Sequence, residues 1–444
     1  MNNKKVKSVS SNLFIIAAFL TVTACGEVAR LPISAGMGPN PSLPAPNQTI
    51  FPTVNIAPAI GWPSGATPVA TNGTKVNAFA TGLDHPRWLY VLPNGDVLVA
   101  ETNGPKKSDS EFSIKGWITG LVMSRAGAGV ASANRITLLR DLNHDGIADM
   151  RLPFIEGLNS PFGMALVGSH LYIANTDSVM RFSYKSGDKS ITLPGVKVLD
   201  LPAGAINYHW TKNLIASTDA TKLYITVGSN SNVAEVGMAA EFERAAIWEL
   251  DLKSGSHRIY ASGLRNPNGL AWDKPSGKLF TVVNERDAIG SDLVPDYLTS
   301  VQYGGFYGWP YSYYGQHVDQ RVQPQAPELV AKSIAPDYAL GSHTGSLGLV
   351  SSDGTSLPTQ FSHGMFIGQH GSWNRKPHSG YKVIFVAMDN GKPAGLPVDI
   401  LTGFLSKSGQ AYGRPVGVAL DKNGALLVAD DVGNTVWRVS KLQN

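Results

Sequence analysis

The chain has 444 residues, of which 43% are hydrophobic and 16% are charged, so its apolar fraction is too high for a disordered protein. Its 47 glycines and 28 prolines indicate many turns and argue against a helical bundle. The formal net charge of +4 includes three lysines near the N-terminus, and the remainder gives no support for nucleic-acid binding. A single cysteine excludes an internal disulfide and a cysteine-based zinc site.

Residues 1–24 have the features of a lipoprotein signal peptide. Three lysines precede an apolar stretch, 13–24, which is too short to span a bilayer. The stretch runs into the sequence VTAC, which resembles a bacterial lipobox, so we expect Cys25 to carry a lipid. Because Gly26 and not Asp follows the cysteine, the resemblance to bacterial lipoproteins implies export to the periplasmic face of the outer membrane. A plain signal peptide with an incidental cysteine is the alternative.

Residues 25–74 are predicted to form a lipidated tether rich in Pro and Gly. The segment has neither the alternation of a strand nor the 3.6-residue period of a helix, and its prolines stiffen it. Its second half is apolar enough to lie against the body of the protein through Ile50, Phe51, Val54, Ile56 and Trp62. Contact with the membrane is expected only through the lipid.

Residues 75–444 contain a repeated phrase: Gly-Leu, then Pro, then two apolar strands joined by a turn. The phrase begins at Gly82, Gly157, Gly263 and, in a weaker form, Gly413. Two further strand pairs, 214–229 and 364–388, lack it. Repeated short antiparallel strands predict an all-β fold, a six-bladed β-propeller, because one blade cannot bury its faces alone. A stacked array of sandwiches is the alternative.

Two of these strand pairs carry strong hairpin signals at their turns. The dipeptides Asn94-Gly95 and Asn423-Gly424 separate apolar runs, and both residue types accept a positive φ. Each dipeptide is therefore predicted to form a hairpin turn. In a ring of blades, equivalent loops share one axial mouth, where a ligand is expected.

Several side chains that could carry chemistry fall in these loops. His209 precedes the strand pair 214–229 and could be a general base with a pKa near neutrality; a structural histidine bonded to backbone is the alternative. Arg265 and Arg414 occupy equivalent loops of two blades, and Arg375 lies near the sixth repeat. Three arginines at one mouth indicate an anionic ligand with several carboxylates, unless each is simply a solvated loop residue.

Two acidic loops could bind calcium. The loop Asp141–Asp149 has oxygen-bearing side chains at alternate positions but lacks the distal Glu of an EF-hand, so a plain acidic turn stays open. The second loop contains Glu285 and Asp292 and could hold Ca²⁺ beside the mouth. No G-x-S-x-G, P-loop or H-E-x-x-H motif is present.

The phrases RNPNGLAW, VVNERD, GGFYGWPYSY and GQHGSWNR resemble the L-sorbosone dehydrogenase family, which is related to the soluble glucose and aldose sugar dehydrogenases that depend on pyrroloquinoline quinone (PQQ). The resemblance extends over residues 54–440. It implies a six-bladed propeller that holds PQQ and Ca²⁺ and oxidises a sugar or a sugar aldehyde. Hydride would pass to the quinone, and electrons would then pass to an external acceptor.

The resemblance also implies roles for individual residues. The catalytic base falls on His209, the cofactor-binding pair on Arg265 and Asn266, and the last-blade arginine on Arg414. A cofactor-binding lysine of the family falls on Arg375 or its neighbour, and the metal is expected at Glu285 and Asp292.

The sequence also departs from the glucose enzymes. Tyr208 stands where they have Asp, and Glu285-Arg286 replaces the Gly-Pro pair whose carbonyls hold calcium. Two other functions stay open: a non-catalytic propeller that binds a sugar or a partner protein through the same mouth, and a propeller lactonase that uses metal-bound water.

Overall fold

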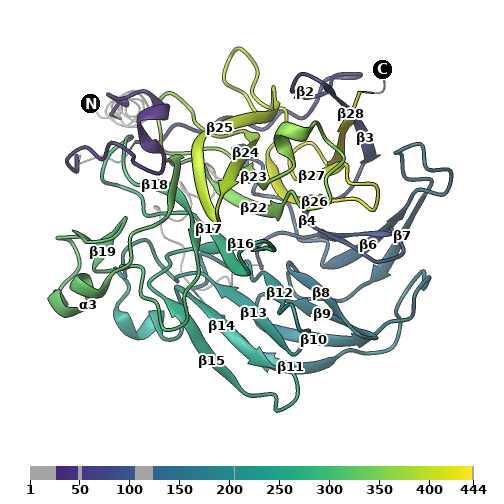
Figure 1. The fold of residues 1–444 in the computed structure, drawn as a ribbon, viewed down its shortest axis with the longest axis horizontal. Helices are drawn as coiled ribbons and strands as arrows, with labels where there is room; N and C mark the ends of the chain where they lie inside the picture. Colours follow the sequence, from purple (N-terminus) through teal and green to yellow (C-terminus); the bar gives the residue numbers. More distant parts are fainter. Residues whose placement is uncertain (1–26, 49–52, 106–123, 205, 443–444) are drawn as a thin grey trace, which may run out of the picture.

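The computed structural model describes residues 27–48, 53–105, 124–204 and 206–442. Six antiparallel sheets of four or five strands are arranged around a central axis (Figure 1). The predicted all-β, six-bladed propeller is therefore confirmed. The short α-helix α3 (Pro327–Lys332) lies outside the blades.

The first three blades follow the chain in order, from the inner strand outward. Blade 1 consists of β4 (Pro86–Val91), β5 (Val97–Glu101), β6 (Arg135–Arg140) and β7 (Met150–Ile155). Blade 2 consists of β8 (Met164–Val167), β9 (His170–Ala174), β10 (Ser178–Ser183) and β11 (Val196–Asp200). Blade 3 consists of β12 (Leu214–Ala216), β13 (Lys222–Val227), β14 (Ala246–Asp251) and β15 (His257–Ser262).

The other three blades each take a strand from the N-terminal part of the chain. Blade 4 consists of β16 (Pro267–Asp273), β17 (Lys278–Val283), β18 (Pro295–Ser300), β21 (Tyr338–Ser342) and β1 (Met37–Gly38). Blade 5 consists of β22 (Ser346–Ser351), β23 (Gly364–Gln369), β24 (Lys382–Asp389), β25 (Lys392–Thr402) and β2 (Val69–Ala70). Blade 6 consists of β26 (Pro415–Leu420), β27 (Leu426–Asp430), β28 (Thr435–Lys441) and β3 (Thr74–Thr81).

The ring is closed by two contacts between distant parts of the chain. The inner strands β4, β8, β12, β16, β22 and β26 contact one another in that order, and β26 contacts β4. Blade 6 combines three C-terminal strands with β3, which pairs with β28 from Thr81↔Thr435 to Thr74↔Lys441. An N-terminal strand thus completes the last blade and leaves no open blade edge between first and last repeats.

The hydrophobic core lies between neighbouring blades. The second strands β5 and β27 are buried along their whole length, as expected for strands covered on both faces. One core cluster joins Leu98 of blade 1 to Ile173 of blade 2, and another joins Phe280 of blade 4 to Ile367 of blade 5. Burial on both sides explains why these strands are continuous apolar runs in the sequence.

The repeated phrase marks inner strands, as predicted, in four blades. Its loops lead into β4, β8, β16 and β26, and Gly82, Gly157 and Gly263 have positive φ values of 66–75°. The strand pair predicted at 364–388 is present, but it does not include an inner strand. It covers β23 and β24, the second and third strands of blade 5. The inner strand β22, with the sequence SLGLVS, was missed because serines and a glycine interrupt its apolar pattern.

The two predicted hairpins are present: they join β4 to β5 and β26 to β27. Gly95 and Gly424 have φ values of 97° and 78°, but neither preceding asparagine has a positive φ. The turns are five-residue loops in which Gly95 N–H donates to the carbonyl of Leu92, and Gly424 N–H to that of Asp421. In each of these loops only the glycine of the dipeptide lies in the left-handed region.

The N-terminal segment lies on the propeller over residues 27–48 and 53–74. In Figure 1 its dark purple trace passes near β18 and β25. Trp62 packs edge-on against Phe404 and Trp437, with ring centroids 5.4 and 5.3 Å away. The predicted signal peptide and Cys25 lie outside the described residues, and no described helix is long and apolar enough to cross a membrane.

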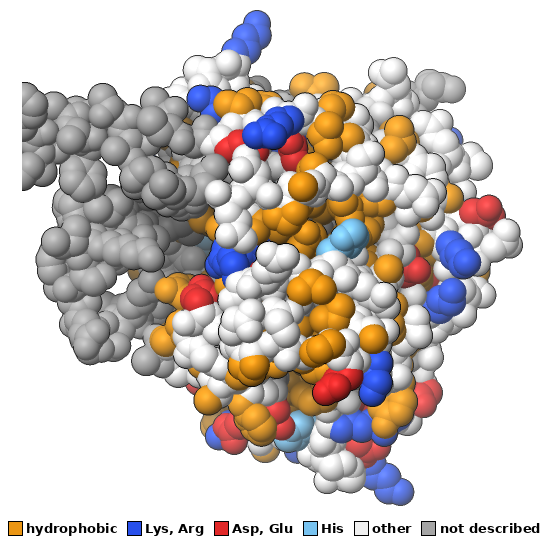
Figure 2. All heavy atoms as spheres, turned by 90° about the vertical axis from the view of Figure 1, so that its left-hand side faces the viewer, with side chains coloured by type: hydrophobic (Ala, Val, Ile, Leu, Met, Phe, Trp, Pro, Cys, Tyr) orange, Lys and Arg blue, Asp and Glu red, His pale blue; other side chains and the backbone are white. Residues whose placement is uncertain are grey.

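An insertion between β18 and β21 projects from blade 4. It contains β19 (Ser312–Tyr313), β20 (His317–Val318) and α3. Figure 2 views this side and shows hydrophobic side chains over the middle of the face, with acidic and basic side chains interspersed. Tyr303, Val318 and Leu329 are exposed here, so the insertion adds apolar surface to the outer edge of the blade.

Candidate functional site

One mouth of the propeller collects the loops that carry the predicted side chains. The inner and second strands of each blade are antiparallel, so the loop before an inner strand and the loop after a second strand reach the same end. His209 precedes β12, Arg265 precedes β16, and Arg414 precedes β26. Asp287 and Asp431 follow β17 and β27 at the same end. The structure therefore brings His209, Arg265 and Arg414 to one mouth, and the same topology brings Asn266, Glu285 and Arg375 to this end.

His209 is held by Ser229, which follows β13. Its Nδ1 lies 2.7 Å from the Ser229 carbonyl oxygen and 3.1 Å from the Ser229 hydroxyl oxygen. Because a carbonyl can only accept, Nδ1 carries the hydrogen, and in the neutral ring Nε2 carries the lone pair. Burial, and then the positive charge of Arg265, lower the pKa of His209 to about 3. The imidazole is thus neutral at physiological pH, with a pKa far below the near-neutral value expected.

Asn266 lies beside His209 across Gly228. A Cβ on Gly228 would lie 2.5 Å from the Cβ of His209 and 2.6 Å from Oδ1 of Asn266. Only glycine therefore allows the two residues to approach so closely. The Oδ1 atom of Asn266 is buried and has no hydrogen-bond partner among the described residues. This acceptor is available to a ligand.

Arg265 is held by backbone carbonyls and by Asp287. Its Nη1 donates to the carbonyl of Glu285 at 2.7 Å and to that of Asn284 at 3.2 Å. Its Nε donates to the carbonyl of Asn232 at 3.3 Å, and its Nη2 lies 3.3 Å from a carboxylate oxygen of Asp287. The guanidinium is therefore fixed in place by the protein beside His209.

Asp287 connects this group to His343 and Asn374. Its Oδ1 accepts a hydrogen bond from Nδ2 of Asn374 at 2.6 Å and lies 3.3 Å from Nδ1 of His343. Burial alone would raise the pKa of Asp287, but Arg265, His343 and Asn374 outweigh it and hold the pKa below its usual value. Burial would lower the pKa of His343, but Asp287 outweighs it and raises the pKa. Asp287 is ionised and His343 is biased toward its charged form.

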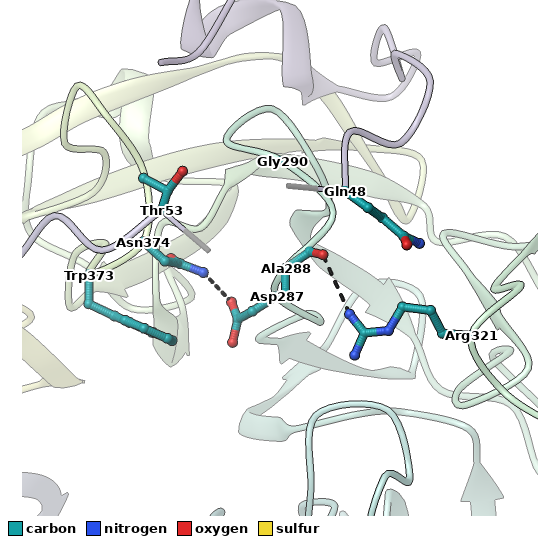
Figure 3. Close-up of a pocket in the computed structure, with 8 residues that line it drawn as sticks. All are labelled: Gln48, Thr53, Asp287, Ala288, Gly290, Arg321, Trp373 and Asn374. Atoms are coloured by element: carbon teal, nitrogen blue, oxygen red, sulfur yellow. Dashed lines mark hydrogen bonds between the residues drawn. The ribbon is translucent and has the colours of Figure 1, made fainter. Parts of the chain in front are cut away.

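A cavity of about 250 Å³ adjoins Asp287. Figure 3 shows its side chain between Trp373 and Arg321, with Asn374 bonded to it. The lining also includes Gln48 and Thr53 of the N-terminal segment, together with Ala288 and Gly290. Asp287 is thus shared between the cavity and the polar group around His209.

The two remaining predicted arginines contact the N-terminal segment. Arg375 Nη2 lies 3.5 Å from a carboxylate oxygen of Asp292 and donates to the carbonyl of Leu31 at 3.3 Å. Arg414 lies over the ring of Tyr381, 5.0 Å from its centroid, and donates to the carbonyl of Ala57 at 3.2 Å. The Nε atoms of both arginines are buried without an acceptor among the described residues. Each arginine thus binds the N-terminal segment and keeps one unused donor.

The residues predicted to bind calcium have other partners. Glu285 accepts the backbone N–H of Arg286 at 2.8 Å, and burial raises its pKa to about 7. Asp292 accepts two backbone N–H groups of the N-terminal segment, at 2.7 and 3.2 Å, and pairs with Arg375. No three His, Cys, Asp or Glu side chains among the described residues gather in a way that could hold a metal ion. Calcium at Glu285 and Asp292 stays a prediction.

The loop Asp141–Asp149 uses its side chains to stabilise its own turn. The carboxylates of Asp141, Asp145 and Asp149 each accept a backbone N–H from within the loop, at 2.7 to 2.9 Å. These bonds favour the plain acidic turn over a calcium site.

Sequence reasoning missed a second cluster at the mouth, centred on Asp431. Its Oδ2 lies 2.6 Å from Nη1 of Arg87, 2.9 Å from Nε2 of His370 and 3.5 Å from Nε2 of His85. These partners come from blades 1 and 5. The sequence signal for this cluster was His85 and Arg87, which flank Pro86 in the first repeated loop. Their contact with Asp431 could not be predicted, because it forms only when the last blade packs against the first.

The chain matches the model of TrAA12-like proteins over residues 68–296 and 320–442. The chain belongs to the TrAA12-like family. Within it, residues 249–370 also match the model of the glucose/sorbosone dehydrogenases. The resemblance predicted from the sequence motifs is therefore confirmed at the level of the family.

Solved structures with the same fold include two fungal proteins and a bacterial one. A Trichoderma reesei enzyme of carbohydrate-active family AA12 has a TM-score of 0.68 at 18% identity, covering 87% of this chain and 99% of that one. The holo PQQ domain of Coprinopsis cinerea pyranose dehydrogenase has 0.67 at 20%, covering 87% and 100%. The soluble aldose sugar dehydrogenase of Escherichia coli has 0.56 at 16%, covering 83% and 100%.

One curated relative comes from Borreliella burgdorferi. This uncharacterized protein is 28% identical over 293 residues, which cover 64% of this TrAA12-like chain and 76% of the relative. It adds no activity to the family assignment.

Proposed function

We propose that this TrAA12-like protein is a PQQ-dependent oxidoreductase that oxidises a sugar or a sugar aldehyde. The observation that carries the proposal is the geometry of His209, whose Nδ1–H is fixed on the Ser229 carbonyl beside Arg265. The match to glucose/sorbosone dehydrogenases over 249–370 and the likeness to the PQQ domain of pyranose dehydrogenase support the substrate class and the cofactor.

The described residues fit the quinone through unused polar atoms. Oδ1 of Asn266 and Nε of Arg414 are buried without partners at the mouth. Asn266 would accept a hydrogen bond from the cofactor, Arg414 would donate to one of its three carboxylates, and Arg265 would orient it. PQQ supplies an electron-accepting quinone when bound, and the protein supplies position and charge.

His209 would take the proton from the hydroxyl of the substrate, or of an aldehyde hydrate, while hydride leaves the same carbon. Nε2 accepts this proton because Nδ1–H is committed to Ser229. The carbonyl of Ser229 stabilises the resulting imidazolium, whereas Arg265 disfavours it. The base is therefore ready at neutral pH and releases its proton readily once the products leave.

The experiment that tests this function adds PQQ and Ca²⁺ to the purified apo-protein and screens aldoses and ketoaldehydes with an artificial electron acceptor. Dye reduction that requires PQQ is the expected result. Sugar binding without dye reduction would favour the non-catalytic propeller, and ester hydrolysis without quinone would favour the lactonase. Either outcome would overturn the proposal.

We also propose that the protein is an outer-membrane lipoprotein that faces the periplasm and passes electrons to an external acceptor. The support is the lipobox-like sequence around Cys25, the only cysteine in the chain. Cys25→Ser is expected to move the protein from the membrane fraction to the soluble periplasmic fraction, as read by immunoblot of fractionated cells. A variant that stays with the membranes as the original does would contradict the anchor.

A further inference from the structure

The cluster around Asp431 adjoins two guanidinium groups, of Arg87 and Arg414, and of these two only Arg87 forms an ion pair with the described residues there. Asp431 is ionised, because burial alone would raise its pKa but His370, His85 and Arg87 outweigh it and hold the pKa below its usual value. Burial lowers the pKa of His370 to about 4, so this imidazole is neutral. Arg414 has no carboxylate within ion-pair distance among the described residues. The neighbouring Asp430 carboxylate is occupied by Trp62, Trp437 and the backbone N–H of Arg414, and burial raises its pKa to about 6. Of the two guanidinium groups, only that of Arg87 is therefore paired directly with a carboxylate of the described residues.

Arg87 and Arg414 lie close enough to repel each other. Arg87 lies in the inner strand β4 and Arg414 directly precedes the inner strand β26. These strands are neighbours in the ring (Figure 1), and the charge of Arg414 lowers the pKa of Arg87. Two cations in a poorly solvated site are unfavourable unless an anion joins them.

Both arginines also keep a buried donor without an acceptor. The Nε atoms of Arg87 and Arg414 have no hydrogen-bond partner among the described residues, and the side chain of Arg87 is only 12% exposed. Leaving such a donor unpaired in a buried site is unfavourable. The unpaired donors and the guanidinium of Arg414, which has no ion-pair partner among the described residues, both point to an anionic ligand.

The cluster lies beside the proposed base. The guanidinium carbon of Arg87 is 5.7 Å from the ring centroid of Trp210, the residue after His209. An anionic group held by Arg87 would thus lie next to the loop that carries His209. A metal ion does not fit here, because Arg87 contacts the same oxygen of Asp431 as the two histidines.

We propose that Arg87, fixed by Asp431 and acting with Arg414, binds a carboxylate of the ligand at the mouth. A guanidinium fork matches a planar carboxylate with two parallel hydrogen bonds. The carboxylate belongs either to the quinone or to an acidic sugar substrate. This inference rests on the proposed function and adds Arg87 to its binding residues.

The test compares Arg87→Met with Arg258→Met in the full chain. Arg258 is a matched control, because it pairs with Glu249 at 2.8 Å and lies over Tyr303 at 4.4 Å on the outer edge of blade 3, away from the mouth. Calorimetric titration of apo-protein with PQQ is expected to show at least tenfold weaker binding in Arg87→Met, equal to about 1.4 kcal/mol, and no change in Arg258→Met. Arg87→Lys keeps the positive charge and should lose less PQQ affinity than Arg87→Met. It replaces Arg87→Met if circular dichroism shows that Arg87→Met is unfolded.

Two further measurements distinguish a carboxylate of the quinone from a carboxylate of the sugar. They also distinguish failure of this inference from failure of the proposed function. If Arg87→Met binds PQQ normally but raises the KM for glucuronate and not for glucose, the carboxylate belongs to the sugar. Benzene-1,3,5-tricarboxylate is a redox-inactive probe that carries three carboxylates. If it binds in an Arg87-dependent manner while PQQ does not bind, the carboxylate site is supported and the proposed PQQ-dependent function is refuted. Unchanged affinity for PQQ, glucuronate and the tricarboxylate in a folded Arg87→Met variant would overturn the inference.

Discussion

At the residue scale, the carbonyl of Ser229 decides which nitrogen of His209 can act as a base. The sequence indicated that His209 is a candidate base. It could not indicate the hydrogen-bond partner of His209, because Ser229 lies 20 residues further along the chain, after β13. Nor could it predict the strength of the base, since the low pKa of His209 arises from burial and from Arg265 of another blade. The identity of a site residue was readable from the motif, whereas its chemistry depended on the packed ring.

His209→Gln tests this residue directly. Glutamine keeps a hydrogen-bonding side chain but cannot take the proton, and general-base help is worth about 10²–10⁴-fold. We expect at least about 10²-fold slower dye reduction with unchanged PQQ affinity, measured by single-turnover kinetics and by titration.

The dependence of the wild-type rate on pH is a second test of His209. Because the pKa of His209 is lowered to about 3, its imidazole stays neutral as the pH falls from 7 to about 5. The wild-type rate should therefore show no loss from His209 protonation in that range. A His209→Gln enzyme that works at the wild-type rate would refute the role.

At the scale of the element, the inner strand β22 shows where pattern reading fails. Its sequence SLGLVS has no clear alternation, yet it is hydrogen-bonded to β23 and packs against β26. A Cβ on Gly348 would collide with the carbonyl oxygen of Val416. The glycine that hides this strand in the sequence is thus what allows the inner strands of blades 5 and 6 to approach.

Gly348→Ala should destabilise the protein through this close approach. Overpacking a core position typically costs about 1–3 kcal/mol, so we expect a lower midpoint in urea unfolding followed by circular dichroism. Gly36→Ala is the matched control, because its Cβ would make only an ordinary contact, 3.6 Å from the hydroxyl of Ser342. Equal midpoints for both variants would show that the backbone at β22 shifts without loss.

At the scale of the whole molecule, the repeated sequence phrase predicted the ring of blades. It did not predict the contacts of the N-terminal segment or those between side chains of different blades. The six blades were readable because each repeat leaves apolar faces that only a neighbour can bury. The docking of residues 27–48 was not readable, since its contacts to Asp292 and Arg375 use backbone groups that any sequence provides. The Asp431 cluster was missed for a related reason: its members come from three blades and share no motif.

Removal of β3 should prevent the ring from closing. A chain that begins at residue 82 lacks the partner of β28, which exposes an unpaired edge that promotes aggregation. We expect this truncation to elute as aggregates in size-exclusion chromatography. A chain that begins at residue 74 is the control, because it keeps β3 and lacks only β1, β2 and the rest of the N-terminal segment; it should elute as the untruncated protein does. A monomeric, folded protein that begins at residue 82 would show that β3 is dispensable.

The pairing of β3 with β28 has a consequence for the nascent chain. Arg87 lies near the start of the propeller and Asp431 near its end, so their ion pair forms across the seam of the ring. During synthesis this contact is absent until the last blade has emerged. The ligand site therefore matures in a single late event, and an incompletely translated or C-terminally clipped molecule would be unable to load its ligand however well its earlier blades had folded.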